Sequence, residues 1–426
     1  MVLKRNRRGY AVVVKHVDLI MEKYDYLIIG GGIAGVTAAE TIRGENSQAS
    51  IAIISAEPYP LYSRVSLPRF LKKKISREQL FLRKSNDFSD KDIKLRLGEK
   101  VLFVDVGRKE VGLENGVALG YEKLLISSGG RATDWRKPEN QEFIYHLQTL
   151  DDADRLYGAL AEIKQPLVVG ASFISLEFLE IFTVNKITPS VILRNNYFLE
   201  KTLGPIGGDI LKSNLERYDI RIQFNDSIGE VQRESEGRVV VVTRALRRIE
   251  CDALALGVGV DRNIEFLKGS GIRLGEKGIL TSEFLESSED GIFAAGDTAE
   301  FYDTILGAHH VVGNWTNAFL QGRRAGLNMS GQREPFKNVT GYSITSFGFQ
   351  ITVLGYCHNE LESIVRSDLA LNQYERFFLK DGVLVGASLI NRFEDKPHLV
   401  GLIESKKNME EYKEKMKDFS FDIRAI

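Results

Sequence analysis

The stretch LIIGGGIAGVTAAE at residues 27–40 decides the fold. An apolar run is followed there by Gly30, Gly32 and Gly35, which have the spacing of the dinucleotide-binding fingerprint. The first glycine of that fingerprint permits a tight turn, the second lets the backbone meet a pyrophosphate, and the third lets the following helix pack against the strand. The stretch therefore predicts a strand, a glycine turn and a helix that together hold a dinucleotide.

The neighbouring residues complete a strand–helix–strand unit. The helix is expected to run from Val36 onward, and IAIIS at 51–55 is typical of a second buried strand. The amides of Ile33 and Ala34 at the helix start would face the phosphates along the positive end of the helix dipole. An acidic residue is expected near the end of the second strand to hold a ribose, and Glu57 is the candidate. The alternative is that Glu57 is an exposed loop carboxylate.

The stretch LVVGASFISLEFLE at 167–180 repeats this pattern. It keeps Gly170 but has Ser172 and Ser175 at the other two glycine positions. The strand SVILR at 190–194 follows it, as IAIIS follows the first turn. Two such units predict two nucleotide-binding domains, one of them a duplicate of the other.

The second site is open to two interpretations. Ser175 is a mild change, since the third glycine is often alanine. Ser172 places a Cβ where the backbone should approach the pyrophosphate, although its hydroxyl could donate to a phosphate. Arg194 stands where an acidic residue would hold the ribose of NAD, and an arginine there can hold the 2′-phosphate of NADP. The site therefore either binds NADPH or NADH, or is vestigial. The residues expected to line it are Gly170, Ser172, Phe173, Ile174, Arg194 and Gly259.

Composition excludes several other functions. The 426-residue chain has 57 basic and 58 acidic side chains, so we expect no binding to nucleic acid. Its two cysteines, Cys251 and Cys357, are far apart, which disfavours a disulfide framework and a metal site. Any redox chemistry would therefore use a bound cofactor. No apolar stretch approaches the roughly 18 residues of a membrane span, and we expect a cytoplasmic protein.

The chain is expected to have an α/β fold with two Rossmann-like dinucleotide-binding domains and a small α+β C-terminal domain. From about residue 335 the pattern becomes strand-rich, with a predicted hairpin turn at Asp381-Gly382. The predicted parts are an N-terminal extension at 1–23, a first domain formed by 24–140 and 262–332, a second domain at 141–261, and a C-terminal domain at 333–426.

Three further stretches point to a known family: YEKLLISSGGR at 121–131, DALALGVGVDRNIEFLKGSGI at 252–272 and GIFAAGD at 291–297. Over about residues 24–400 the chain resembles the flavoprotein oxidoreductases of the pyridine nucleotide–disulfide reductase superfamily. It looks closest to the branch without a redox disulfide. That branch contains ferredoxin and rubredoxin reductases, the flavin part of assimilatory nitrite reductases, and apoptosis-inducing-factor-like proteins. The resemblance implies that the first domain binds FAD.

The resemblance also implies particular contacts with FAD. The family's aspartate in the third stretch binds the ribityl chain, which corresponds to Asp297 with Gly296 beside it. Trp315, at the start of an expected helix, would form a wall of the flavin site or belong to the core. The residues expected to touch FAD are Gly30, Gly32, Ile33, Ala34, Gly35, Glu57, Arg64, Arg69, Val101, Ser128, Gly129, Arg131, Gly296, Asp297 and Trp315.

The stretch PLYSRVSLPRFL at 60–71 resembles the family's loop beside the flavin, which carries an arginine and then a lysine five residues later. Arg64 matches the arginine, and Arg69 stands in place of the lysine. The family's lysine pairs with a glutamate matched by Glu177, so Arg69 and Glu177 are the expected catalytic pair. The alternative is an ordinary surface salt bridge. An arginine keeps the positive charge but does not change its protonation as a lysine can. No cysteine lies in this loop, which disfavours disulfide reduction.

The expected function is that of an FAD-dependent oxidoreductase. Electrons would pass from NADH or NADPH through FAD to a small redox protein or a small-molecule acceptor, such as ferredoxin, rubredoxin, a quinone or oxygen. One alternative is an FAD-binding relay subunit of a multi-subunit dehydrogenase, with a vestigial nicotinamide site. Another is an interaction protein with bound flavin. The C-terminal domain would either form a homodimer interface or cap the flavin.

Overall fold

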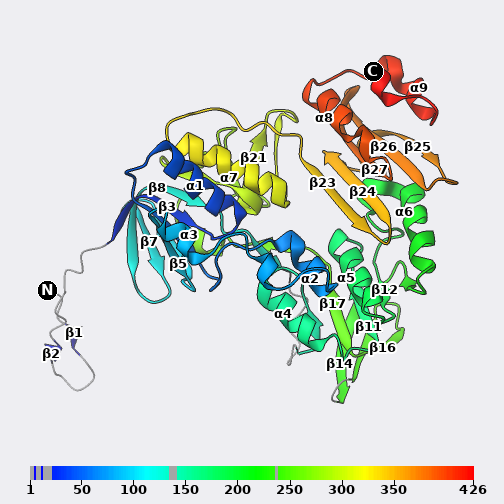
Figure 1. The fold of residues 1–426 in the computed structure, drawn as a ribbon, viewed down its shortest axis with the longest axis horizontal. Helices are drawn as coiled ribbons and strands as arrows, with labels where there is room; N and C mark the ends of the chain where they lie inside the picture. The colour runs from blue at the N-terminus through cyan, green and yellow to red at the C-terminus, as the bar shows by residue number, and fades with distance from the viewer. Residues whose placement is uncertain (1–3, 6–10, 13–21, 134–141, 236–237) are drawn as a thin grey trace.

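The computed structural model describes residues 4–5, 11–12, 22–133, 142–235 and 238–426. Most of the predicted N-terminal extension at 1–23 lies outside these ranges, except that β1 (Lys4–Arg5) pairs antiparallel with β2 (Ala11–Val12). Figure 1 shows three parts, each built around a main sheet, and the first of them contains both early and late segments of the chain. The predicted boundaries between these parts remain predictions.

The first part contains a mixed sheet with the order β5-β4-β3-β8-β7-β6, and β20 lies beside β8. Its parallel strands are β3 (Lys23–Ile29), β4 (Ile51–Ser55), β5 (Ile93–Leu97), β8 (Ala118–Ile126) and β20 (Ile292–Ala294). Its antiparallel strands are β6 (Val101–Asp105) and β7 (Glu110–Leu113). A smaller sheet contains β19 (Ile279–Thr281), β21 (Ala299–Asp303) and β22 (Ala308–His310). Because β20 comes late in the chain, the first part is formed from two segments of sequence that lie on either side of the second part.

Two helices, α1 (Ile33–Glu45) and α7 (Trp315–Met329), pack against each other in the first part (Figure 1). Glycines make this close approach possible, because a Cβ on Gly322 would collide with the carbonyl oxygen of Ala34. A Cβ on Gly326 would likewise lie 2.8 Å from the carbonyl oxygen of Ala38. The packing brings the N-terminus of α7 to the side of the glycine turn. Two short helices, α2 (Leu67–Leu71) and α3 (Ser85–Ser89), lie between β4 and β5 in the chain.

The second part has a five-stranded parallel sheet with the order β10-β17-β11-β12-β13. These strands are β10 (Ile144–Tyr145), β17 (Ala253–Leu256), β11 (Pro166–Val169), β12 (Ser190–Ile192) and β13 (Arg221–Gln223). The other elements are α4 (Leu150–Ala159), α5 (Phe173–Val184), α6 (Glu200–Glu216) and an antiparallel sheet of β14 (Ile228–Ser235), β15 (Arg238–Thr243) and β16 (Arg248–Cys251). The chain enters through β9 (Gly130–Ala132) and returns through β18 (Val260–Arg262), and these two strands pair antiparallel.

The C-terminal part is a five-stranded antiparallel sheet in the order β23-β24-β27-β26-β25, with two helices. The strands are β23 (Gly341–Ser346), β24 (Phe349–Gly355), β25 (Glu362–Asp368), β26 (Gln373–Lys380) and β27 (Val383–Ile390), and the helices are α8 (Lys396–Glu404) and α9 (Lys413–Lys417). The predicted hairpin at Asp381-Gly382 is confirmed, since these residues join β26 to β27.

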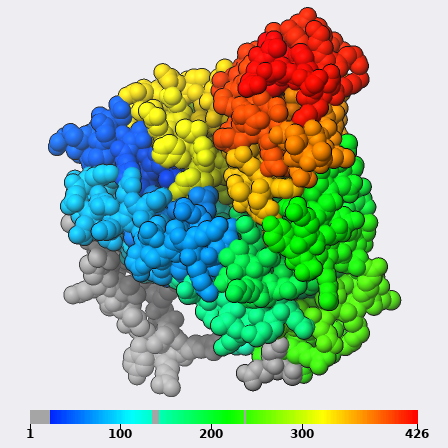
Figure 2. Space-filling view, turned by 45° about the vertical axis from the view of Figure 1, so that its right-hand side comes forward, coloured from blue at the N-terminus to red at the C-terminus, as the bar shows by residue number. Residues whose placement is uncertain are grey.

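The C-terminal sheet is attached to α6 of the second part. The Tyr374 hydroxyl donates to the carbonyl oxygen of Leu203, and the Ser388 hydroxyl donates to that of Thr202 at 2.8 Å. In Figure 2 the orange and red C-terminal part lies directly over the green second part. The predicted fold class is confirmed: an α/β protein with two Rossmann-like units and a smaller α+β C-terminal part. In the described part of the chain, no helix is long and apolar enough to cross a bilayer.

Candidate cofactor-binding site

The three glycines of the first turn are not all required by packing. Gly30 has a φ of 117°, and a Cβ there would collide with the carbonyl oxygen of Ser127. A Cβ on Gly35 would collide with the carbonyl oxygen of Gly30. Gly32 is different: no described atom lies within 4 Å of a Cβ placed there, and its φ of −78° suits any residue. Packing within the described chain therefore explains glycine at 30 and 35 but not at 32, and the close approach of a pyrophosphate to Gly32 stays a prediction.

Gly32 is the N-cap of α1, and no side chain caps that helix end. The amides of Ile33 and Ala34, the first two helical residues, are therefore placed as the sequence predicts for binding a phosphate. Ala34 is buried, and its Cβ would lie 3.3 Å from a Cβ on Gly296. The GIFAAGD stretch consequently ends beside the helix terminus.

Asp297 lies in a 3-10 turn at Gly296–Thr298, which α7 holds in place, because Gln321 Oε1 accepts the Gly296 N–H at 2.8 Å. The carboxylate of Asp297 accepts no hydrogen bond from any residue in the described ranges. Burial raises its pKa, and the positive charges of Arg262 and Arg64 partly offset this effect. A half-buried carboxylate with free acceptor atoms fits the hydroxyl groups of a ribityl chain. It does not cap α7, whose N-cap is Asn314.

Glu57 belongs to a polar cluster and is not an exposed loop carboxylate. It accepts a hydrogen bond from the Tyr62 hydroxyl at 2.6 Å and forms an ion pair with Arg64. Arg64 also donates to the carbonyl oxygen of Gln148. Burial lowers the pKa of Arg64, but the negative charge of Glu57, with a smaller contribution from Asp297, makes the net shift upward. Contact of Glu57 and Arg64 with FAD stays a prediction.

The turn after β8 is tied to the returning chain. The Ser128 hydroxyl donates to the carbonyl oxygen of Asn263 at 2.6 Å, and Arg131 forms an ion pair with Glu265 at 2.5 Å. Gly129 between them has no neighbour within 4 Å of an added Cβ among the described atoms. This turn therefore has one open position, like the first glycine turn at Gly32.

Two apolar candidates lie within or against the core. Val101 is buried in a cluster with Ile29 and Ile54 of the central strands. Trp315 is the first residue of α7 and is half-buried against the cluster that contains Ala34. A core role therefore explains Val101, and the position of Trp315 agrees with both of its predicted roles.

The predicted pairing of Arg69 with Glu177 is wrong. Arg69 is exposed on α2, whereas Lys72, at the end of that helix, is buried and pairs with Glu177 at 3.1 Å and with Glu180 at 2.8 Å. The lysine in this chain follows Arg64 by eight residues and not by five, so counting along the loop missed it. Which cation reaches Glu177 depends on how α2 packs against α5. The adjacent lysines at 72–74 were the available signal.

Burial dominates the electrostatics of this group. It raises the pKa of Glu177, while the positive charge of Lys72 opposes the shift. Burial lowers the pKa of Lys72, but the two carboxylates outweigh burial and the net shift is upward. The group is therefore a charged lysine held between two glutamates at the contact between the first and second parts.

The second glycine turn is closed by its serines. Gly170 has a φ of 113°, and a Cβ there would lie 2.5 Å from the carbonyl oxygen of Gly257. The Ser172 hydroxyl donates to that same oxygen at 2.8 Å and accepts from the Ser175 N–H at 3.3 Å. The Ser172 hydroxyl thus has an acceptor within the turn, and its donation to a phosphate stays a prediction. Phe173 packs its ring edge against Tyr342, with centroids 4.7 Å apart.

The remaining residues of the second site lie at the ends of strands. Arg194 follows β12 and is exposed. Ile174 is half-buried in the first turn of α5. Gly259 follows β17, and a Cβ there would lie 3.6 Å from Thr133 Oγ1. The structure thus brings the predicted residues of each turn to the carboxyl ends of the parallel strands, where dinucleotides bind in this class of fold.

The two turns contain the same packing contact with its residues exchanged. In the first, Gly35 faces Ser127, and a Cβ on Gly35 would lie 2.7 Å from the serine Oγ. In the second, Ser175 faces Gly257, and a Cβ on Gly257 would collide with the Ser175 Oγ. Ser175 is therefore accommodated because the facing strand has glycine where the first unit has serine.

This exchange predicts an energetic coupling between Ser175 and Gly257. We expect Gly257→Ala to reduce the free energy of unfolding by about 1–3 kcal/mol through overpacking. In a Ser175→Gly background the same change should cost clearly less, since the Oγ is gone. Urea unfolding of the wild type, both single variants and the double variant measures the coupling. Equal costs of Gly257→Ala in the two backgrounds would contradict the explanation.

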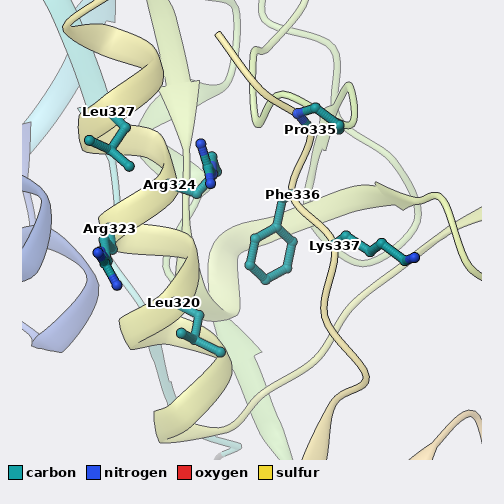
Figure 3. A pocket seen from close by; sticks show the side chains of 7 residues that line it. All are labelled: Leu320, Arg323, Arg324, Leu327, Pro335, Phe336 and Lys337. Carbon is teal, nitrogen blue, oxygen red and sulfur yellow. The ribbon is translucent and has the colours of Figure 1, made fainter. Parts of the chain in front are cut away.

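A separate cavity of about 330 Å³ lies between α7 and the segment at 335–337. Figure 3 shows Leu320 and Arg324 of α7 opposite Phe336 of this segment. The lining residues are Leu320, Arg323, Arg324, Leu327, Pro335, Phe336 and Lys337. None of them belongs to the glycine turns or to the Asp297 turn, so this cavity is distinct from the candidate cofactor site. Among the described residues, no group of His, Cys, Asp or Glu side chains could hold a metal ion.

Residues 24–322 match the family model described as pyridine nucleotide-disulphide oxidoreductase. Residues 338–407 match the model described as the rubredoxin NAD+ reductase C-terminal domain. The chain belongs to the pyridine nucleotide-disulphide oxidoreductase family, and the predicted family is confirmed.

The chain is similar in sequence or fold to apoptosis-inducing factors and to rubredoxin and ferredoxin reductases. Apoptosis-inducing factor 3 of Mus musculus is 28% identical over 369 residues, which are 86% of this chain and 60% of the relative. The chain therefore spans less than two thirds of that relative. NADH-rubredoxin oxidoreductase of Clostridium acetobutylicum is 28% identical over 391 residues, which are 92% of this chain and 97% of the relative. A ferredoxin reductase structure from Rhodopseudomonas palustris has a TM-score of 0.85 at 24% identity and covers 94% of this chain and 99% of its own, which shows the shared fold.

Proposed function

We propose that this protein is an FAD-dependent oxidoreductase that takes electrons from NADH or NADPH and passes them to a small redox protein or another small acceptor. The observation that carries the proposal is Gly32, a glycine that packing does not require, at the uncapped N-terminus of α1. The free carboxylate of Asp297 lies beside the same helix terminus. The donors and acceptors at this site fit a dinucleotide, and the relative named NADH-rubredoxin oxidoreductase supports the reaction class.

Bound FAD would supply hydride acceptance and onward electron transfer. The protein's own residues would bind FAD and orient it. The amides that follow Gly32 would donate to the pyrophosphate, and Asp297 would accept from the ribityl hydroxyls. The ion pairs of Lys72 with Glu177 and Glu180 would hold a charged lysine at the contact between the two nucleotide-binding units. The predicted catalytic role of Arg69 is weakly supported, because Arg69 is exposed and Lys72 is the residue that pairs with Glu177.

Rapid mixing of the anaerobic, purified protein with NADPH and, separately, with NADH tests this function. We expect the visible flavin absorbance to disappear within the turnover time of such enzymes, roughly 0.001–1 s. Dithionite serves as the control, because it must bleach the same sample whatever the nicotinamide site does. Bleaching by dithionite but by neither nucleotide would contradict the proposal.

The second candidate is an FAD-binding relay subunit that binds no nicotinamide. It is favoured by Ser172, whose Cβ stands where the equivalent Gly32 has none, and whose hydroxyl is used within the turn. The mixing experiment separates the two functions. The cytoplasmic location and the homodimer expected from the sequence stay predictions.

A further inference from the structure

Arg194 lies at the position that distinguishes NADP from NAD in dinucleotide-binding units. In a dinucleotide-binding βαβ unit, the adenosine ribose lies at the carboxyl end of the second strand. An acidic residue there binds the free 2′-hydroxyl, whereas an arginine accommodates a 2′-phosphate. In this chain that strand is β12, and Arg194 is the second residue after it. Its side chain is exposed at the edge of the sheet where the glycine turn of α5 also lies.

Two carboxylates near Arg194 are engaged elsewhere. Glu200 accepts a hydrogen bond from Asn195 Nδ2 at 2.6 Å. Asp226 follows the neighbouring strand β13, but its side chain is buried and accepts the N–H groups of Ser227 at 2.8 Å and Ala245 at 3.2 Å. Neither carboxylate is therefore placed to accept a hydrogen bond from a ribose hydroxyl at this position.

The guanidinium of Arg194 is available for a ligand. Within the described ranges it forms no ion pair and no hydrogen bond, unlike Arg64, Arg77 and Arg131. A guanidinium presents a planar fork of donors that matches the oxygens of a phosphate, and it stays charged at all relevant pH values. The position consequently favours a phosphate monoester over a hydroxyl.

We propose that the second unit prefers NADPH to NADH, and that Arg194 determines this preference by binding the 2′-phosphate. The proposal rests on the proposed function and departs from the relative named for NADH. A charge-assisted bidentate contact of this kind corresponds to a preference of about 10- to 100-fold.

The decisive experiment measures flavin reduction and adenosine binding in parallel. Flavin reduction by NADPH and by NADH is followed for the wild type, Arg194→Gln and Arg194→Glu. Calorimetry measures binding of adenosine 2′,5′-bisphosphate and of 5′-AMP to the same proteins. Arg221→Gln is the matched control, because Arg221 is also an exposed arginine but lies at the opposite end of the adjacent strand β13.

We expect the wild type to prefer NADPH and the bisphosphate, Arg194→Gln to lose the preference, and Arg194→Glu to reverse it. Arg221→Gln should behave as the wild type does. A wild type that prefers NADH, or a preference for NADPH that Arg194→Gln leaves intact, would overturn the inference. If neither nucleotide reduces the flavin but the bisphosphate binds in an Arg194-dependent way, the proposed function fails and the inference about the site stands. If neither nucleotide reduces the flavin and neither adenosine probe binds, both fail.

Discussion

Replacing Gly32 by valine is expected to give a folded protein that no longer retains FAD. No described atom lies within 4 Å of a Cβ at this position, so the change should not disturb the chain itself. The N-cap effect of the substitution is about 1 kcal/mol or less. The new side chain would fill the space where the amides of α1 meet a pyrophosphate, and the loss of those charge-assisted hydrogen bonds should weaken FAD binding by about 100-fold or more.

Substitutions at two other glycines serve as controls for Gly32→Val. Gly30→Ala should unfold more easily, because its Cβ would collide with the Ser127 carbonyl oxygen and its φ is 117°. Gly44→Ala, on the exposed side of the same helix, meets no described atom and should keep FAD, with a stability equal to or about 0.5–1 kcal/mol above the wild type. The flavin-to-protein ratio after gel filtration, together with circular dichroism, measures these outcomes. A Gly32→Val protein with a full complement of FAD would contradict the cofactor site.

Replacing Lys72 by methionine is expected to destabilise the protein by about 3–5 kcal/mol at neutral pH. The change leaves Glu177 and Glu180, which are 13% and 14% exposed, without the cation that lies between them. Lys73→Met is the matched control, since Lys73 is an exposed neighbour, and it should change the free energy of unfolding by no more than about 0.5 kcal/mol.

The cost of Lys72→Met should depend on pH. Burial raises the pKa of Glu177 above the ordinary 4.5, and the loss of Lys72 would raise it further. A carboxyl group with a raised pKa in the folded state favours folding below its unfolded pKa, and this contribution is lost as the pH rises through the folded value. The variant should therefore lose less stability at about pH 5 than at about pH 8. Urea unfolding at both pH values measures the difference, and a cost independent of pH would contradict the assigned charges.

Local chemistry explains what could be predicted from the sequence. The turns at Gly30 and Gly170 were predictable because a left-handed backbone and a close strand require glycine whatever surrounds them. The position of Asp297 followed from the family motif at the end of a strand. The hydrogen-bond acceptor of the Ser172 hydroxyl was not predictable, because it is the carbonyl oxygen of Gly257, which lies 85 residues away in the chain. The choice of Lys72 over Arg69 likewise depends on contacts between helices that are distant in the chain.

The attachment of the C-terminal sheet to α6 limits how the molecule could close around a nucleotide. The Tyr374 and Ser388 hydroxyls donate to carbonyl oxygens of α6, so the C-terminal sheet should move together with the second unit. The covalent connections of this combined body to the first unit run through the paired strands β9 and β18 on one side and the segment before β23 on the other. The C-terminal part also contacts the first unit, since Lys406 Nζ donates to the carbonyl oxygen of Thr304 at 3.0 Å and Ile305 packs in the C-terminal core. Any movement of the second unit away from the first would therefore have to break these contacts as well.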